Sequence, residues 1–252
     1  MGDALRLAVG TLTAIPVPPP RQVDTDVARK AMLLAPLAAL PLAVLACAVV
    51  FGADVVGLPP LVTAVLVVGS LALGTRGMHL DGLADTADGL GASYDRERAL
   101  DVMRKGDVGP MGMATVVLVL LGQIAALTGA IAADHGVFAA AVGVLAGRLV
   151  LGMCCLRMVP AARPGGLGAA VAGSTPMWQV GLALTIGAAL AALAGVAAGL
   201  APWRGVLAVL LALVASGALL WRCVRRLGGI TGDVLGACVE AATLGALLAL
   251  AA

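Results

Sequence analysis

Charge is the feature that this sequence has least of. Among its 252 residues, 12% are charged and 2% are aromatic, whereas 61% are apolar. Soluble domains carry about 25% charged residues, so this chain cannot cover a globular surface with charge. Disordered and fibrous proteins are excluded because they lack such apolar content, and a net charge of +2 argues against nucleic acid as a partner. A polytopic α-helical membrane protein remains.

Paired cysteines with metal-ligand or disulfide spacing are also missing. No two cysteines are separated by two residues, and all of them lie in or beside apolar runs. Their number is odd, so we expect reduced core thiols and neither a disulfide framework nor a zinc site. They are Cys47, Cys154, Cys155, Cys223 and Cys238.

Long apolar runs, by contrast, are abundant. A helix needs about 20 apolar residues to cross the hydrocarbon core of a bilayer, and seven stretches are candidates. They cover residues 31–51, 61–75, 111–132, 137–159, 177–200, 205–221 and 234–252. A short amphipathic piece and a proline-rich turn at 16–20 precede them. The sequence therefore predicts an all-α fold: a polytopic integral membrane helix bundle of about seven transmembrane helices plus an N-terminal interfacial helix, with residues 1–252 as a single domain.

The basic residues predict the orientation of this bundle. If the N-terminus is cytoplasmic, the inner loops hold every lysine and arginine except Arg204 and Arg148, and Arg148 falls within a span. Such a bias is typical of cytoplasmic loops. We therefore expect a multi-pass protein with residues 76–110 as a cytoplasmic loop between the second and third spans.

This loop is where the acidic residues gather. Half of the 14 acids lie in it, and Asp81, Asp85 and Asp88 are spaced i, i+4, i+7. On a helix they lie within about 60° of one another, where they repel unless a cation sits among them. Oxygen-only ligands suit Mg²⁺, held by a few carboxylates plus substrate phosphates. These three residues are our candidate Mg²⁺ ligands; the alternative is a solvated acidic helix face.

A second polar segment, GGITGDVLGACVE, lies near the C-terminus. Asp233 and Glu240 are seven residues apart and share a helix face, and a glycine-rich turn ending at Gly232 precedes them. Such a turn, leading into a helix, offers backbone N–H groups to a phosphate. The alternative is a loop plus an acid that caps the helix. Glu240 falls inside a predicted span, where a carboxylate is usually functional.

Basic partners for a phosphate are present on the same side. Lys105 and Arg163 lie in predicted inner loops, and Arg148, within a span, needs a carboxylate or phosphate partner. Each of these basic residues could instead serve only to orient the protein in the membrane. His79 is a lone histidine, and such a residue more often has a structural role than a ligand-binding one. Taken together, the residues predict a Mg²⁺-dependent transferase acting on a phosphoanhydride at the cytoplasmic surface.

Four motifs carry a resemblance to a known family. HLDGLADTADGLG, MRKGDVGPMG, ARPGGLG and GGITGDVLGACVE, in this order, resemble the cobalamin synthase family of adenosylcobinamide-GDP ribazoletransferases, from Pro16 to about Glu240. The second motif departs from the family's commonest form, MKDSRIGTFG. Here Lys105 stands in place of an acid and Asp107 in place of a base.

The resemblance implies a reaction and a location. The family joins adenosylcobinamide-GDP to α-ribazole or its 5′-phosphate, releases GMP, and needs Mg²⁺. It implies a multi-pass protein of the bacterial cytoplasmic membrane with its active site facing the cytoplasm. The partners are then these small molecules and the lipid bilayer, and both a monomer and a homo-oligomer remain open.

Roles for individual residues follow from this scheme as hypotheses. Asp81, Asp85 and Asp88 would hold Mg²⁺ against the diphosphate, and Asp233 would complete the metal shell or act as a base. The remaining candidates would contact the substrate: His79, Lys105, Arg148, Arg163, Gly232 and Glu240.

Two other functions remain in competition. CDP-alcohol phosphotransferases also use aspartate-rich helices for Mg²⁺, but their DGxxAR pattern needs an arginine that DGLADT lacks. A transporter would place its acids along a path through the bilayer, ideally in repeated halves. No internal repeat is evident, and the acids gather at one face.

Overall fold

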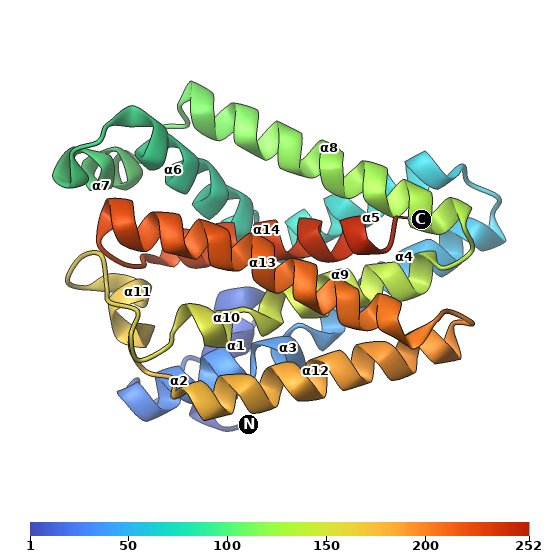
Figure 1. Ribbon diagram of the computed structural model, residues 1–252, viewed down its shortest axis with the longest axis horizontal. Helices are drawn as coiled ribbons and strands as arrows, with labels where there is room; N and C mark the ends of the chain where they lie inside the picture. Colours follow the sequence, from blue (N-terminus) through green and yellow to red (C-terminus); the bar gives the residue numbers. More distant parts are fainter. Residues whose placement is uncertain (252) are drawn as a thin grey trace.

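The computed structural model describes residues 1–251; residue 252, the end of the last predicted span, lies outside the described residues. The described chain is a bundle of helices without named strands (Figure 1). The helices are α1 (Asp3–Leu12), α2 (Thr25–Leu33), α3 (Ala35–Ala38), α4 (Leu40–Val55), α5 (Pro60–Gly74), α6 (Met78–Ala92), α7 (Arg96–Lys105), α8 (Pro110–Ala132), α9 (Gly136–Leu149), α10 (Leu151–Cys154), α11 (Gly166–Val171), α12 (Met177–Ala197), α13 (Pro202–Leu227) and α14 (Gly232–Ala249).

The long helices confirm a polytopic bundle. Five segments are long and apolar enough to cross a membrane: α8, α9 with α10, α12, α13 and α14. They correspond to the last five predicted spans. α14 lies in the centre, where it packs against α6, α8, α9 and α13. It is apolar on nearly all sides, which is the pattern of a buried helix.

The N-terminal part differs from the prediction. The stretch 31–51 is not one span but is divided among α2, α3 and α4, because Pro36 and Pro41 lack the N–H that a continuous helix needs and instead begin new helices. α4 has 16 residues and α5 has 15, so each is about 24 Å long or less, short of the ~30 Å core. α5 and α6 meet at 88°. The predicted count of about seven spans is therefore not confirmed: the structure supports five, or six if α5 and α6 form one broken span.

The loops that the sequence assigns to the inner side lie at one end of the bundle. Figure 1 shows α6, α7, α11 and the α13–α14 turn together at this end. The α4–α5, α8–α9 and α12–α13 turns and the C-terminus lie at the opposite end. The first group is called the site end below, and the second the far end.

Candidate functional site

The crossing of α6 and α14 builds the site. A Cβ placed on Gly82 of α6 would lie 2.7 Å from the backbone oxygen of Asp233, and one on Gly236 of α14 would lie 3.2 Å from the Cα of His79. A side chain at either glycine would push the helices apart. The two glycines thus allow the acidic face of α6 to lie against the first turn of α14.

Two α6 carboxylates are free of protein hydrogen bonds. Asp81 is exposed and Asp85 is buried, and within residues 1–251 neither accepts a hydrogen bond from another group. Asp85 also feels the negative charges of Asp81, Asp233 and Asp88 and the positive charge of Arg163. Gathered carboxylates repel, so this region favours the binding of a cation.

Asp88 has a different environment. Its two carboxylate oxygens accept hydrogen bonds from the backbone N–H groups of Gly109, at 2.7 Å, and Gly112, at 2.8 Å, at the start of α8. A Cβ at either glycine would collide with this carboxylate. Asp88 therefore caps α8, and its charge complements the positive end of that helix. This contact explains why glycine stands at positions 109 and 112, two of the three glycines of MRKGDVGPMG.

The N-terminus of α14 brings a base and an acid together. The Thr231 side chain caps the helix by accepting from the N–H of Val234 at 3.2 Å, and it donates to Asp233 at 3.1 Å. The guanidinium nitrogen Nη2 of Arg163 lies 3.6 Å from the same oxygen, Oδ2 of Asp233. The other terminal guanidinium nitrogen of Arg163, Nη1, is buried and has no hydrogen-bond partner among the described residues.

The loop that carries Arg163 is fixed to the α13–α14 turn by its backbone. Ile230 donates its N–H to the oxygen of Pro160 and accepts from the N–H of Ala162, both at 2.9 Å. A Cβ on Gly168 would lie 2.6 Å from the Cα of Thr231. The motifs ARPGGLG and GGITGDVLGACVE, which are some 60 residues apart, thus form one unit.

A cavity of about 300 Å³ opens where these elements meet. Several predicted residues line it together: His79, Asp81, Arg163, Gly232 and Asp233. Thr231 also lines it, as do three glycines that were not among the predicted residues: Gly165, Gly166 and Gly168. Their signal was the glycine pair in ARPGGLG, since Gly165 and Gly166 both have positive φ, a conformation that glycine adopts readily.

The other predicted residues lie outside this cavity. Lys105, the last residue of α7, is exposed. Asp85 and Asp88 lie farther along α6, and Arg148 and Glu240 are buried deeper in the bundle. Proximity in the structure therefore favours Asp81, Asp233 and Arg163 over Lys105 as ligand contacts.

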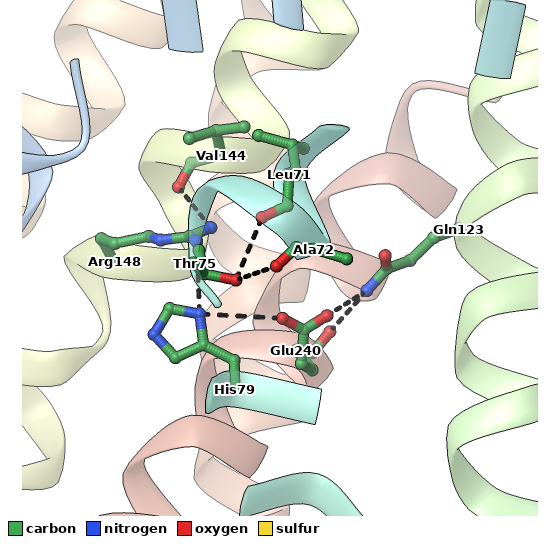
Figure 2. Close-up of polar contacts among 8 residues, drawn as sticks. All are labelled: Leu71, Ala72, Thr75, His79, Gln123, Val144, Arg148 and Glu240. Carbon is green, nitrogen blue, oxygen red and sulfur yellow. Dashed lines mark hydrogen bonds and ion pairs between the residues drawn. The ribbon is translucent and has the colours of Figure 1, made fainter. Parts of the chain in front are cut away.

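Arg148 and Glu240 belong to a second polar group, the inner cluster, formed by His79, Gln123, Arg148 and Glu240 (Figure 2). Gln123 donates to a carboxylate oxygen of Glu240 at 2.7 Å. An Arg148 nitrogen lies 3.3 Å from Nδ1 of His79, which is itself 3.9 Å from Glu240. Sequence reasoning missed Gln123, whose signal is a lone amide side chain in the apolar helix α8.

The carboxylates of the site suit a hard cation only if a bound ligand supplies some of the coordinating oxygens. Among residues 1–251, no group of three or more His, Cys, Asp and Glu side chains is placed to hold a metal ion. The carboxylates without protein hydrogen bonds are nevertheless oxygen donors of the type that Mg²⁺ prefers, and Mg²⁺ commonly shares its shell with substrate phosphates. The arrangement can thus bind a cation together with a phosphate, held also by Arg163 and the N–H groups of α14.

Fold and site together define a multi-pass helical membrane protein whose polar groups converge on a cavity at one end. A sequence-family model described as Cobalamin-5-phosphate synthase matches residues 4–251, and the chain belongs to this family. The resemblance seen in the four motifs is thereby confirmed, and the chain is a transferase of cobalamin biosynthesis.

Curated relatives agree with this assignment. A protein of a Nocardioides species, named adenosylcobinamide-GDP ribazoletransferase, is 49% identical over the whole of both chains. Proteins with the same name from Frankia casuarinae and Bradyrhizobium diazoefficiens are 41% and 34% identical, each over 98% of this chain and 93% of their own. No solved structure matches the chain significantly.

Proposed function

We propose that the chain joins adenosylcobinamide-GDP to α-ribazole or α-ribazole 5′-phosphate, releasing GMP and giving adenosylcobalamin or its 5′-phosphate. The observation that carries this proposal is the convergence of Asp81, Asp233 and Arg163 on one cavity in a member of this family. A diphosphate needs positive partners and a cation; Arg163 supplies a positive partner, and the carboxylates of α6 would bind the cation.

The residues divide the work as follows. Arg163, with a buried nitrogen that lacks a partner within residues 1–251, and the N–H groups of α14 bind the phosphates and orient the donor. Asp81 and Asp85 are the residues that would hold Mg²⁺, and Asp88 keeps α6 and α8 in register. The chemistry that the ion would supply there is positive charge, which stabilises the negative charge developing on the leaving phosphate.

The transfer itself is a displacement at phosphorus. A ribose hydroxyl of α-ribazole attacks the phosphorus attached to cobinamide, and the bond from that phosphorus to the GMP oxygen breaks. Asp233 takes the hydroxyl proton, because Thr231 and Arg163 hold its carboxylate in place at the cavity wall. Positioning and charge neutralisation supply most of the rate acceleration in such a reaction.

The location of the protein belongs to the same proposal. The chain works in the bilayer of the bacterial cytoplasmic membrane, with the site end toward the cytoplasm. The gathering of the basic loops at that end supports this orientation, since cytoplasmic loops are enriched in lysine and arginine.

A substrate screen with purified protein in lipid nanodiscs tests the proposal. With adenosylcobinamide-GDP and Mg²⁺, we expect GMP release when α-ribazole or its 5′-phosphate is added. We expect no transfer from CDP-activated donors to inositol or glycerol phosphate. Transfer to those alcohols, or uptake of unmodified corrinoid into proteoliposomes without GMP release, would contradict the proposal.

A further inference from the structure

The two ring nitrogens of His79 lie in different surroundings. The residue is 4% exposed and lines the cavity. Its Nδ1 faces Arg148 at 3.3 Å, whereas its buried Nε2 has no hydrogen-bond partner among the described residues. Figure 2 shows Nε2 on the side of the ring away from Glu240. One nitrogen is thus occupied by the inner cluster, and the other is available to a ligand.

The contact with Arg148 determines where the ring hydrogen lies. A guanidinium group has hydrogen-bond donors and no acceptor, so Nδ1 of His79 accepts from it. An imidazole that accepts at Nδ1 carries its hydrogen on Nε2. His79 therefore presents a donor, Nε2–H, and not a lone pair, at the position without a partner.

The rest of the inner cluster keeps Arg148 in this place. Another nitrogen of Arg148 donates to the backbone oxygen of Val144 at 3.4 Å. Glu240, held by Gln123, supplies the opposite charge nearby. A buried guanidinium without a compensating carboxylate is unfavourable, so Glu240 is needed to keep Arg148 against the ring.

We propose that His79 donates a hydrogen bond from Nε2 to a phosphate oxygen of the ligand bound in the cavity, and that Arg148, positioned by Glu240 and Gln123, fixes the tautomer that makes this possible. The inference rests on the proposed function in one respect only, that the cavity ligand is a phosphate ester or diphosphate. A buried donor without a partner is unfavourable until an acceptor arrives, so the ligand gains from meeting it.

The second histidine of the chain is a matched control. His135 is also 4% exposed, but both of its ring nitrogens lie near backbone oxygens, those of Ala133 at 3.0 Å and Leu250 at 2.7 Å. It lies at the far end, beside the start of α9. His135 therefore stabilises the fold without offering a group to the cavity ligand.

The first test is the ¹⁵N spectrum of ring-labelled histidine in the complete protein in nanodiscs. The chain has two histidines, so a His135→Gln variant assigns the signals of His79. We expect an unprotonated Nδ1 and a protonated Nε2, and we expect the Nε2 signal to move when inorganic pyrophosphate is added with Mg²⁺. A protonated Nδ1, or an Nε2 signal that pyrophosphate leaves in place, would overturn the inference.

The second test is functional. His79→Phe keeps a ring but removes the donor, and we expect kcat/KM for adenosylcobinamide-GDP to fall about 10- to 100-fold, the effect of losing a hydrogen bond to a charged group. His79→Gln keeps a side-chain N–H and should recover most of this loss, and His135→Gln should leave kcat/KM unchanged. Equal kcat/KM for wild type and His79→Phe, or an equal loss for both His79 variants, would contradict the inference. If His79→Phe does not fold, the glutamine variant and the spectrum still decide.

The outcomes separate this inference from the proposed function. A pyrophosphate response at Nε2 in a protein that makes no corrinoid product would support the role of His79 and refute the proposed reaction. The opposite result is efficient GMP release by the wild type and by His79→Phe, with an Nε2 signal that pyrophosphate does not shift. It would support the reaction and refute the role of His79.

Discussion

Buried polar groups at the two ends of the bundle differ in whether other protein groups lie within hydrogen-bond distance of them. At the far end, both ring nitrogens of His135 lie within hydrogen-bond distance of backbone oxygens. At the site end, Asp85 accepts no hydrogen bond from described protein groups, and Nε2 of His79 and one nitrogen of Arg163 are buried without partners. Buried polar groups are normally satisfied, and the unpartnered atoms of His79 and Arg163 belong to residues that line the cavity, where a ligand can supply the missing partners. The comparison teaches that burial of a polar residue alone does not identify the site.

The largest expected difference in rate is between a variant that loses a carboxylate at the site end and a variant that loses one at the far end. Asp233→Asn should lower the rate of GMP release by on the order of 10²- to 10³-fold, because the group that takes the proton is lost. Asp134→Asn at the far end should leave the rate unchanged, since Asp134 is exposed and its positive φ also suits asparagine. Rates of GMP release measured for both variants test this difference. Equal rates would contradict the assignment of the reaction to the site end.

A smaller effect is expected from adding one methyl group. Gly82→Ala brings a Cβ against the Asp233 backbone, so it should lower the free energy of unfolding by about 1–3 kcal/mol and reduce activity as α6 moves away from α14. Gly69→Ala in α5, with no atom within 4 Å, should raise stability by roughly 0.5–1 kcal/mol and spare activity. Thermal unfolding and GMP release measured on both variants test the pair. A Gly82→Ala protein with wild-type stability and rate would show that the close crossing is not required.

The smallest expected effect on the reaction concerns Asp88. Asp88→Asn keeps one acceptor for the start of α8, so the rate should fall by about tenfold or less, in line with the loss of a helix cap. The Mg²⁺ concentration that gives half of the maximal rate should not change. A titration of the rate with Mg²⁺ measures this directly. A large increase in the required concentration would return Asp88 to the set of metal ligands predicted from helix spacing.

Much of the fold could be predicted from local sequence. The long apolar runs identified the five C-terminal spans because four of them are continuous helices and the fifth, α9 with α10, is interrupted only at Val150. The N-terminal stretch could not be read in this way, because prolines at 36 and 41 divide a run that is apolar throughout. Hydropathy measures only composition, whereas the breaks depend on a missing backbone donor.

The sequence indicated several residues that line the candidate cavity, but not the contacts between helices that place them. The i, i+4, i+7 spacing indicated that Asp81, Asp85 and Asp88 share a helix face. It could not show that Asp88 accepts a hydrogen bond from the backbone of a glycine 21 residues further along the chain. Nor could it reveal the contact of Gln123 with Glu240, 117 residues apart. Helix periodicity describes neighbours within one helix, and the role of each polar group is decided by which other helix it meets.

Magnesium-dependent GMP release by purified protein, compared between wild type and Asp85→Asn, tests the central claim most directly. Adenosylcobinamide-GDP, α-ribazole and increasing Mg²⁺ would be supplied to both proteins, and GMP and the corrinoid product would be quantified together. The account predicts equal amounts of GMP and product for wild type, and little of either for Asp85→Asn at any Mg²⁺ concentration. Intact Mg²⁺-dependent GMP release by Asp85→Asn would contradict the assignment of the cation to the acidic face of α6.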